Sequence, residues 1–237
     1  MTARPLLACG IVPFGSLLQL AIVEQRLGAA SGALDALTFE PGRAEAVRRE
    51  LAVLAPAAVA CGFRLPPPGP AAVGERLCDR QLAKVGIRPN PQLPAGAERD
   101  WVTAVADLAR LEKGAEGARA GAGEAYRGFL CETVPDAVFA RLLGARVPAR
   151  RHPFGVRARI EALGHAAVRF RGGSPWDRRI EEIEAVACAL CAFEALADNA
   201  IELGDRSEGV VVLPGREALA AFDQRALVPV VERLLLH

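Results

Sequence analysis

The stretch LLACGIVPFGSLLQLAIVEQ (residues 6–25) contains two apolar runs separated by a short turn. Residues 6–12 and 17–25 are rich in Leu, Ile and Val, which favour or tolerate β-strands, and PFGS between them is typical of a turn. The stretch therefore predicts a β-hairpin at the start of the fold.

The segments that follow extend the hairpin into a sheet. Residues 33–40 predict a third strand, and apolar residues at helical spacing predict a helix over 42–55 that Pro56 ends. The fully apolar run 57–63 suits a strand buried on both faces. The first part of the chain is therefore predicted as β-β-β-α-β.

A change of composition marks residues 64–124, which are rich in Pro and Gly but contain two helical patterns. We expect a mostly helical insertion here, including helices over 76–86 and 100–114, within a single domain that spans residues 1–237.

The remaining segments return to alternating strands and helices, with Asp136 and Asp177 as expected helix N-caps. The predicted order is a strand over 126–134, helices over 136–144, 156–164 and 178–201, a strand over 209–215 and a last helix over 217–236. The last helix is apolar enough to pack on the sheet or to form a dimer interface, and packing is the expectation. The fold class is therefore α/β, a mixed sheet with flanking helices.

Composition limits the classes of function. The chain of 237 residues is 51% hydrophobic and has a net charge of +1, so no global field attracts nucleic acid and any such binding needs a local basic patch. No apolar run reaches the roughly 20 residues that span a bilayer, and no cleavage site follows the first apolar run. We expect a cytoplasmic protein without a membrane partner, and the richness in Arg and Ala is typical of a GC-rich genome.

The six cysteines lie mostly in apolar stretches and are expected to be reduced, buried thiols. Cys188 and Cys191 have the spacing of a zinc pair, but they fall within a predicted helix and lack a second pair. Core packing is therefore the expectation for both.

Acidic residues fall at two places where a site could form. Glu132 ends an apolar strand, where a lone charge is costly unless it is paired or coordinated. Glu181 and Glu184 lie one turn apart at the start of the helix over 178–201. Carboxylates from different elements are what a pair of Mg²⁺ or Mn²⁺ ions needs, although acids in a first helical turn are also favoured by the helix dipole alone.

The order of elements resembles the ribonuclease H-like fold, and the local sequence resembles an uncharacterised prokaryotic family of predicted RNase H-like nucleases. The resemblance covers most of the chain and rests on ACGIVPFGS, AVACGFRLP, ERLCDRQLAKVGI, CETVPDAVFARLLG with the basic PARRHPFGVRARIEAL, and EEIEAVACALCAFEAL followed by GVVVLPG. It implies a divalent-metal nuclease in which Glu132, Glu184 and Glu181 are the catalytic acids and Glu132 and Glu184 the metal ligands.

Two departures from the family pattern bear on activity. Val12 and Gly62 stand where the resemblance places aspartates of the first and second motifs. Asp35 or Glu40 on the third strand are the alternative acids that could substitute. The expected result is a metal site too weak for efficient phosphodiester hydrolysis.

The basic loop ARRHPFGVRAR is the candidate contact for phosphates. Arg150, Arg151 and Arg157, with Arg76 from the insertion, are the predicted phosphate ligands, and a solvated Arg-rich loop is the alternative. His152 lacks a carboxylate that would orient it as a catalytic base.

Four functions are considered. The favoured one is an RNase H-like protein with a degenerate site, which is weak or inactive in hydrolysis. The alternatives are an active nuclease that uses Glu132 and Glu184 with Mg²⁺ or Mn²⁺, and a non-catalytic module without cofactor that binds nucleic acid or protein. Nucleotide binding of the actin-like kind ranks lowest, because no Gly-rich phosphate loop is present.

Overall fold

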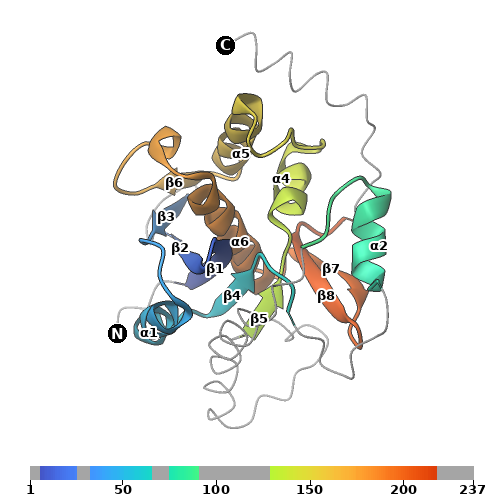
Figure 1. Cartoon of the computed structure of the whole chain (residues 1–237), viewed down its shortest axis with the longest axis horizontal. Helices are drawn as coiled ribbons and strands as arrows, with labels where there is room; N and C mark the ends of the chain where they lie inside the picture. The colour runs from blue at the N-terminus through green and yellow to red at the C-terminus, as the bar shows by residue number, and fades with distance from the viewer. Residues whose placement is uncertain (1–5, 26–32, 66–74, 91–128, 218–237) are drawn as a thin grey trace.

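The computed structural model describes residues 6–25, 33–65, 75–90 and 129–217. In this part of the chain one eight-stranded sheet runs in the order β6-β3-β2-β1-β4-β5-β8-β7 (Figure 1). The strands are β1 (Leu7–Phe14), β2 (Leu17–Gln25), β3 (Leu34–Thr38), β4 (Ala58–Cys61), β5 (Phe129–Glu132), β6 (Val168–Phe170), β7 (Ala200–Asp205) and β8 (Gly209–Pro214). The helices are α1 (Ala44–Leu54), α2 (Leu77–Lys84), α4 (Pro135–Leu143), α5 (Pro153–His165) and α6 (Ile180–Leu196), with a short 3-10 helix η1 (Pro175–Asp177).

The first three strands form an antiparallel meander in which β1 pairs with β2 and β2 with β3. Strand β4 then lies parallel to β1 on its free side, and β5 lies parallel to β4. This is the strand order of the RNase H-like fold, so the expected fold class is confirmed. Strand β8 continues the parallel part beside β5, and β7 closes that edge antiparallel to β8.

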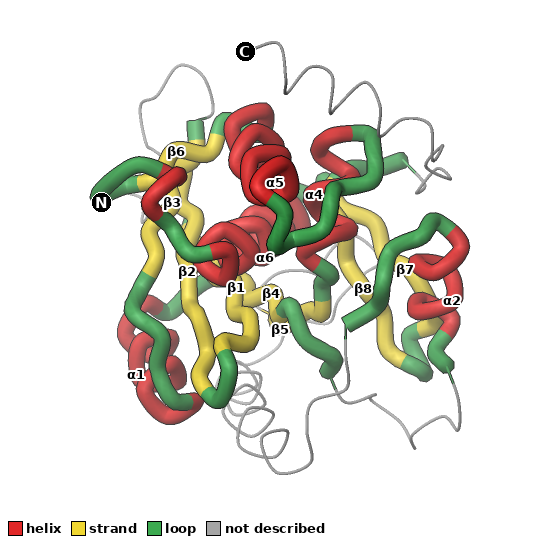
Figure 2. Tube along the Cα trace, turned by 45° about the horizontal axis from the view of Figure 1, so that its top comes forward, coloured by secondary structure: helices red, strands yellow, loops and turns green. Residues whose placement is uncertain are grey.

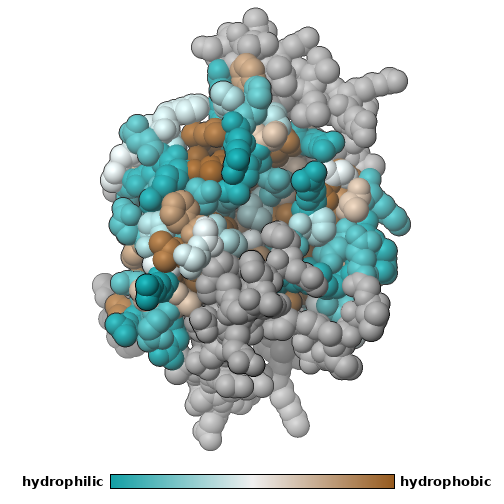
Figure 3. Space-filling model, in the orientation of Figure 1, coloured by the Kyte–Doolittle hydropathy of each residue, from teal (hydrophilic) through white to brown (hydrophobic). Residues whose placement is uncertain are grey.

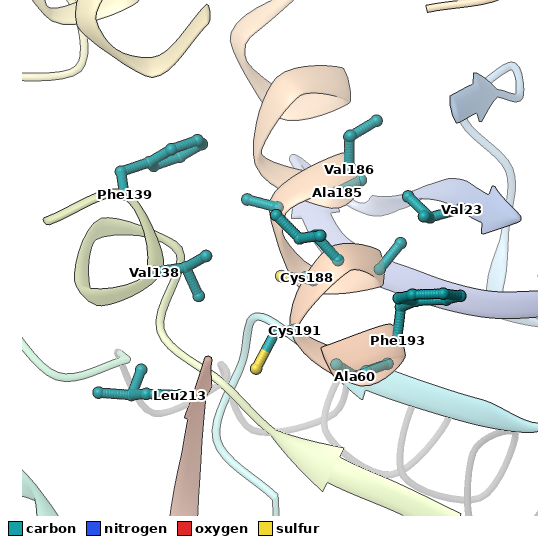
Figure 4. Close-up of a cluster of buried hydrophobic side chains, with 14 of the residues drawn as sticks. Val23, Ala60, Val138, Phe139, Ala185, Val186, Cys188, Cys191, Phe193 and Leu213 are labelled. Carbon is teal, nitrogen blue, oxygen red and sulfur yellow. The ribbon is translucent and has the colours of Figure 1, made fainter. Parts of the chain in front are cut away.

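Helix α6 packs across the middle of one face of the sheet. Every residue from Glu182 to Phe193 is buried, because the helix contacts the sheet on one side and α4 and α5 on the other (Figure 2). Its sequence is rich in Ala and Cys, whose small side chains let several elements approach it at once. Figure 4 shows this packing, with Val138 of α4 and Leu213 of β8 close to Cys191 of α6.

The opposite face of the sheet carries a second, smaller core. Val47 and Leu51 of α1 pack there against Cys9, Ile11 and other buried side chains of β1, β2 and β4. Helix α2 lies beside β7 and β8 at the other end of the sheet (Figure 1). Strands β1 and β4 are thus covered on both faces, as the prediction for residues 57–63 required.

Helix ends differ from the sequence prediction at two places. Helix α4 begins at Pro135 with Val134 as its N-cap, so Asp136 is not the cap; proline at the first helical position needs no N–H partner. Helix α6 begins after Arg179, whose backbone N–H donates to Glu182 Oε2 at 2.9 Å. Asp177 belongs to η1 instead.

Two strands were missed by the sequence prediction. The helix expected over 178–201 ends at Leu196, because Asp198 takes a left-handed φ of 56° and the chain turns back into β7. Asp and Asn tolerate this conformation better than most residues. Strand β6 is only three residues long and pairs with the edge of β3, so its pattern is too short to be read from sequence.

Several predictions fall outside the described residues. They are the helix over 100–114, most of the insertion over 64–124, the first residues of the strand over 126–134, and nearly all of the last helix over 217–236. Within the described part of the insertion, α2 is helical as expected. None of the helices in the described ranges has both the length and the apolar character needed to cross a membrane.

Close packing of α6 on β1 makes a prediction about stability. A Cβ atom added at Gly10 would lie 2.0 Å from the Ala185 carbonyl oxygen and 2.3 Å from the Ala189 nitrogen, both in the backbone of α6. We expect Gly10→Ala to lower the free energy of unfolding by about 3 kcal/mol or more in urea denaturation, because the backbones must separate.

The control is Gly164→Ala within α5, where a Cβ would meet nothing within 4 Å. That change should leave stability unaltered or raise it by about 0.5–1 kcal/mol. Equal effects of the two substitutions would contradict the close approach of α6 to β1.

Candidate functional site

A cleft of about 900 Å³ opens at the carboxyl ends of β1 and β4. Open α/β sheets bind ligands at this end of their strands. The cleft is lined by strand-end residues, by the segment after α2, by the segment between α4 and α5, and by α6: Val12, Pro13, Gly62, Gly86, Ile87, Arg88, Pro89, Asn90, Val134, Pro135, Asp136, Ala140, Arg146, Val147, Pro148, Ala149, Arg150 and Glu184.

The two positions that depart from the family pattern both line this cleft and pack against each other. A Cβ added at Gly62 would lie 2.8 Å from Val12 Cγ1 and 3.1 Å from Cys188 Sγ. An aspartate at position 62 would therefore collide with Val12 unless one of them moved. Val12, Gly62 and Cys188 are therefore packed closely at this wall of the cleft.

Glu132 lies in a buried ion-pair network. Its two carboxylate oxygens accept hydrogen bonds of 2.8 Å from the two terminal nitrogens of Arg76, and a 2.9 Å bond from the Leu65 backbone N–H. Arg76 also donates to both oxygens of Asp79, at 3.0 and 3.1 Å. The side chains of Arg76 and Glu132 are each only 2% exposed. The charge of Glu132 at the end of an apolar strand is therefore balanced by the charge of Arg76.

The Arg76 guanidinium lies between these two carboxylates and donates hydrogen bonds to both. Burial disfavours its charge, but the hydrogen bonds that Arg76 donates to Glu132 and Asp79 outweigh burial and raise the pKa of Arg76 above its usual value. Sequence reasoning made Arg76 a phosphate ligand, whereas its buried side chain is enclosed by carboxylates in the structure.

Glu132 and Glu184 belong to opposite faces of the sheet. Side chains alternate along a strand, and Cys131 belongs to the core under α6 while Leu130 packs on the core under α1. Glu132, next after Cys131, therefore points to the α1 side. Asn90 lies between Glu132 and the cleft, since its side chain lines the cleft and donates to Glu132 at 3.3 Å.

Glu181 and Glu184 are brought together, as their spacing predicted, by one arginine. Arg150 Nη2 lies 2.8 Å from Glu181 and 3.0 Å from Glu184. Burial raises the pKa of Glu184 to about 7, an effect that Arg150 and Arg159 reduce and that Asp136 and Glu181 reinforce. Glu184 is the one of the three predicted acids that lines the cleft.

Asp136 is the acid of the cleft that sequence reasoning missed as a site residue. It is half exposed, lines the same cleft as Glu184, and pairs with Arg159. Arg159 is only 1% exposed and also donates to the Pro148 and Gly155 carbonyls, so it has a structural role. The available signal is the position of Asp136 in the first turn of α4, only four residues after Glu132.

The basic loop is partly neutralised by its own neighbours. Arg157 pairs with Glu161 at 2.9 Å, and Arg150 is shared between two glutamates. Arg151 is exposed and is not among the residues that line the cleft. His152 caps α5 by accepting the Phe154 N–H at its Nδ1.

Two further arginines face the cleft. Arg88 and Arg146 are exposed, line the cleft, and form no ion pair with another residue of the described ranges. The Arg146 guanidinium lies beside Gly86, whose φ of +75° turns the chain after α2 toward the cleft. No motif in the sequence distinguishes Arg88 and Arg146 from the other arginines, and their position in the cleft is apparent only from the fold.

The described residues do not fit a pair of shared divalent ions. No group of three or more His, Cys, Asp or Glu side chains in the described ranges has the geometry to hold a metal. The two possible substitutes have other partners. Asp35 on β3 pairs with Arg171 at 2.8 Å. Glu40 lies beyond the end of β3, is 92% exposed and faces Arg179. Cys188 and Cys191 are fully buried in the core.

The chain matches no protein-family profile and no curated protein. Among solved structures it is similar to RuvC of Thermus thermophilus, with a TM-score of 0.42 and 18% sequence identity. The similarity covers 81% of this chain and 96% of that chain. The likeness is distant, and the fold assignment rests on the strand order described above.

Removal of Arg76 should destabilise the protein strongly. Arg76→Ala leaves Glu132 and Asp79 buried without their cation, which costs about 3–5 kcal/mol in comparable pairs. Urea denaturation measures the change, with Arg216→Ala as the control because that ion pair is exposed and should matter by less than about 1 kcal/mol. A small effect of Arg76→Ala would contradict the network.

The raised pKa of Glu184 predicts a pH dependence of stability. The folded protein holds this proton more tightly than the unfolded chain, so the stabilisation is complete below about pH 4.5 and is lost as the pH rises through about 7. Between pH 4.5 and 8, the stability of the wild type relative to Glu184→Gln should fall by up to about 3 kcal/mol. Parallel pH profiles of the two proteins would contradict the assignment.

Proposed function

We propose that this chain is an RNase H-like protein that binds nucleic acid through phosphate contacts and does not hydrolyse phosphodiester bonds. The observation that supports the absence of hydrolysis is that each predicted site carboxylate is paired with an arginine. Two-metal hydrolysis needs carboxylates that converge on ions about 3.5–4 Å apart. Here Glu132 is enclosed by Arg76 behind the cleft, and Glu184 pairs with Arg150 inside it.

The charge of the cleft supports a binding role. Arg88, Arg146 and Arg150 line it, and guanidinium groups bind phosphate through directed, charge-assisted hydrogen bonds. Such contacts position nucleic acid without reading its sequence. Because the chain has a net charge of only +1, this attraction is local to the cleft.

The test combines a cleavage and a binding measurement on the full chain. Labelled single-stranded DNA and RNA and the matching duplexes are incubated with Mg²⁺ or Mn²⁺, and binding is followed by fluorescence anisotropy between 50 and 200 mM salt. We expect no cleavage, and salt-dependent binding whose slope of log K against log salt falls by about 1.4 in Arg88→Ala/Arg146→Ala, because two single-strand phosphate contacts are lost.

The matched control is Arg49→Ala/Arg206→Ala, which removes two exposed arginines that do not line the cleft. It should keep the wild-type slope. Metal-dependent cleavage that disappears in Glu132→Ala and Glu184→Ala would overturn the proposal in favour of an active nuclease. Absence of both cleavage and binding would overturn the binding role.

A further inference from the structure

The cleft has the size and lining of a small-ligand site. Its volume of about 900 Å³ lies within the usual range of 300–1,000 Å³ for such sites. Much of its wall is apolar. The apolar residues come from the end of β1, the segment after α2, the residue before α4 and the segment between α4 and α5: Val12, Pro13, Ile87, Pro89, Val134 and Val147. A broad phosphate-tracking surface would instead be polar and basic along its length.

The acidic side chains of the cleft are paired with arginines, whereas two of its arginines have no acidic partner among the described residues. Arg88 and Arg146 form no ion pair with other described residues, and the Arg146 guanidinium lies against Gly86, two residues before Arg88. Glu184 and Asp136 are held by Arg150 and Arg159. An anionic group is therefore favoured beside Arg88 and Arg146 and disfavoured beside the two acids.

A phosphate monoester suits a cleft lined by two arginines without acidic partners in the described ranges better than a diester does. A monoester carries about −1.5 to −2 charges at neutral pH, whereas a diester carries one. Asn90, Asp136 and Glu184 supply acceptor oxygens in the same cleft, which suits the hydroxyl and amino donors of a sugar or base. Apolar side chains offer a surface for the faces of a base.

We infer that the cleft holds one nucleotide with a terminal phosphate, with the phosphate monoester bound by Arg88 and Arg146 and the base against the apolar wall. This inference rests on the proposed function and narrows it to strand ends or free nucleotides. Strand ends and free nucleotides both carry a phosphate monoester, and the experiment distinguishes between these two kinds of ligand.

The test measures binding to the full chain by anisotropy and by competition. The probes are 12-residue oligonucleotides with a 5′-phosphate, a 3′-phosphate or only hydroxyl ends, circular single-stranded DNA, AMP and adenosine. We expect AMP to bind at least tenfold more tightly than adenosine, or one phosphorylated oligonucleotide to bind at least tenfold more tightly than the hydroxyl form, in line with a charge-assisted pair of contacts. The first result assigns a free nucleotide and the second a strand end.

Arg88→Ala/Arg146→Ala should abolish the preference for the phosphorylated ligand, and Arg49→Ala/Arg206→Ala should keep it. All four side chains are exposed, and an unchanged thermal midpoint verifies folding in each variant. Equal binding of circular, hydroxyl and phosphorylated DNA would overturn the inference while leaving nucleic-acid binding intact. Binding of AMP with no binding of any oligonucleotide would overturn nucleic-acid binding and support the nucleotide site.

Discussion

The backbones of α6 and β1 pack directly against each other at Gly10, and the position of α6 on the sheet follows from this contact. No side chain separates the two backbones there, and a single added carbon would lie 2.0 Å from a carbonyl of the helix. This contact sets the depth of α6 on the sheet. It thereby brings Cys188 against Gly62 and holds Glu184 at the mouth of the cleft. The Ala and Cys residues of α6 follow from the same constraint, because larger side chains would push the layers apart.

Arginine takes the role of the cation around the acids of this fold. Arg76 lies between Glu132 and Asp79, Arg150 between Glu181 and Glu184, and Arg159 beside Asp136. Guanidinium groups suit this role because they present several donors in a rigid plane and remain charged when buried. On the face shown in Figure 3, most of the described surface is hydrophilic, with small hydrophobic patches. The cleft also contains Arg88 and Arg146, which pair with no acid among the residues that the structure describes.

Local patterns were sufficient for the strands and helices that are long and strongly apolar. The hairpin of β1 and β2, the helix α1 and the buried strand β4 all follow from runs of Leu, Ile, Val and Ala within a few residues of their observed limits. Shorter elements were not predictable, because the three residues of β6 form a strand only through pairing with β3. The helix predicted over 178–201 includes the first two residues of β7, because apolar periodicity does not report the chain reversal at Asp198.

Three properties can be read directly from the chain: the order of the main elements, the absence of aspartates at positions 12 and 62, and the shared position of Glu181 and Glu184 on one helix face. These properties depend on residue identity and on spacing along a single element. Which charges meet depends instead on how the elements pack together. Glu132 and Arg76 are 56 positions apart in sequence, and the side of the sheet to which Glu132 points depends on the pairing of β5 with β4. Asp136, Arg88 and Arg146 reach the cleft from separate segments for the same reason: distance along the chain carries no information about contacts that folding creates.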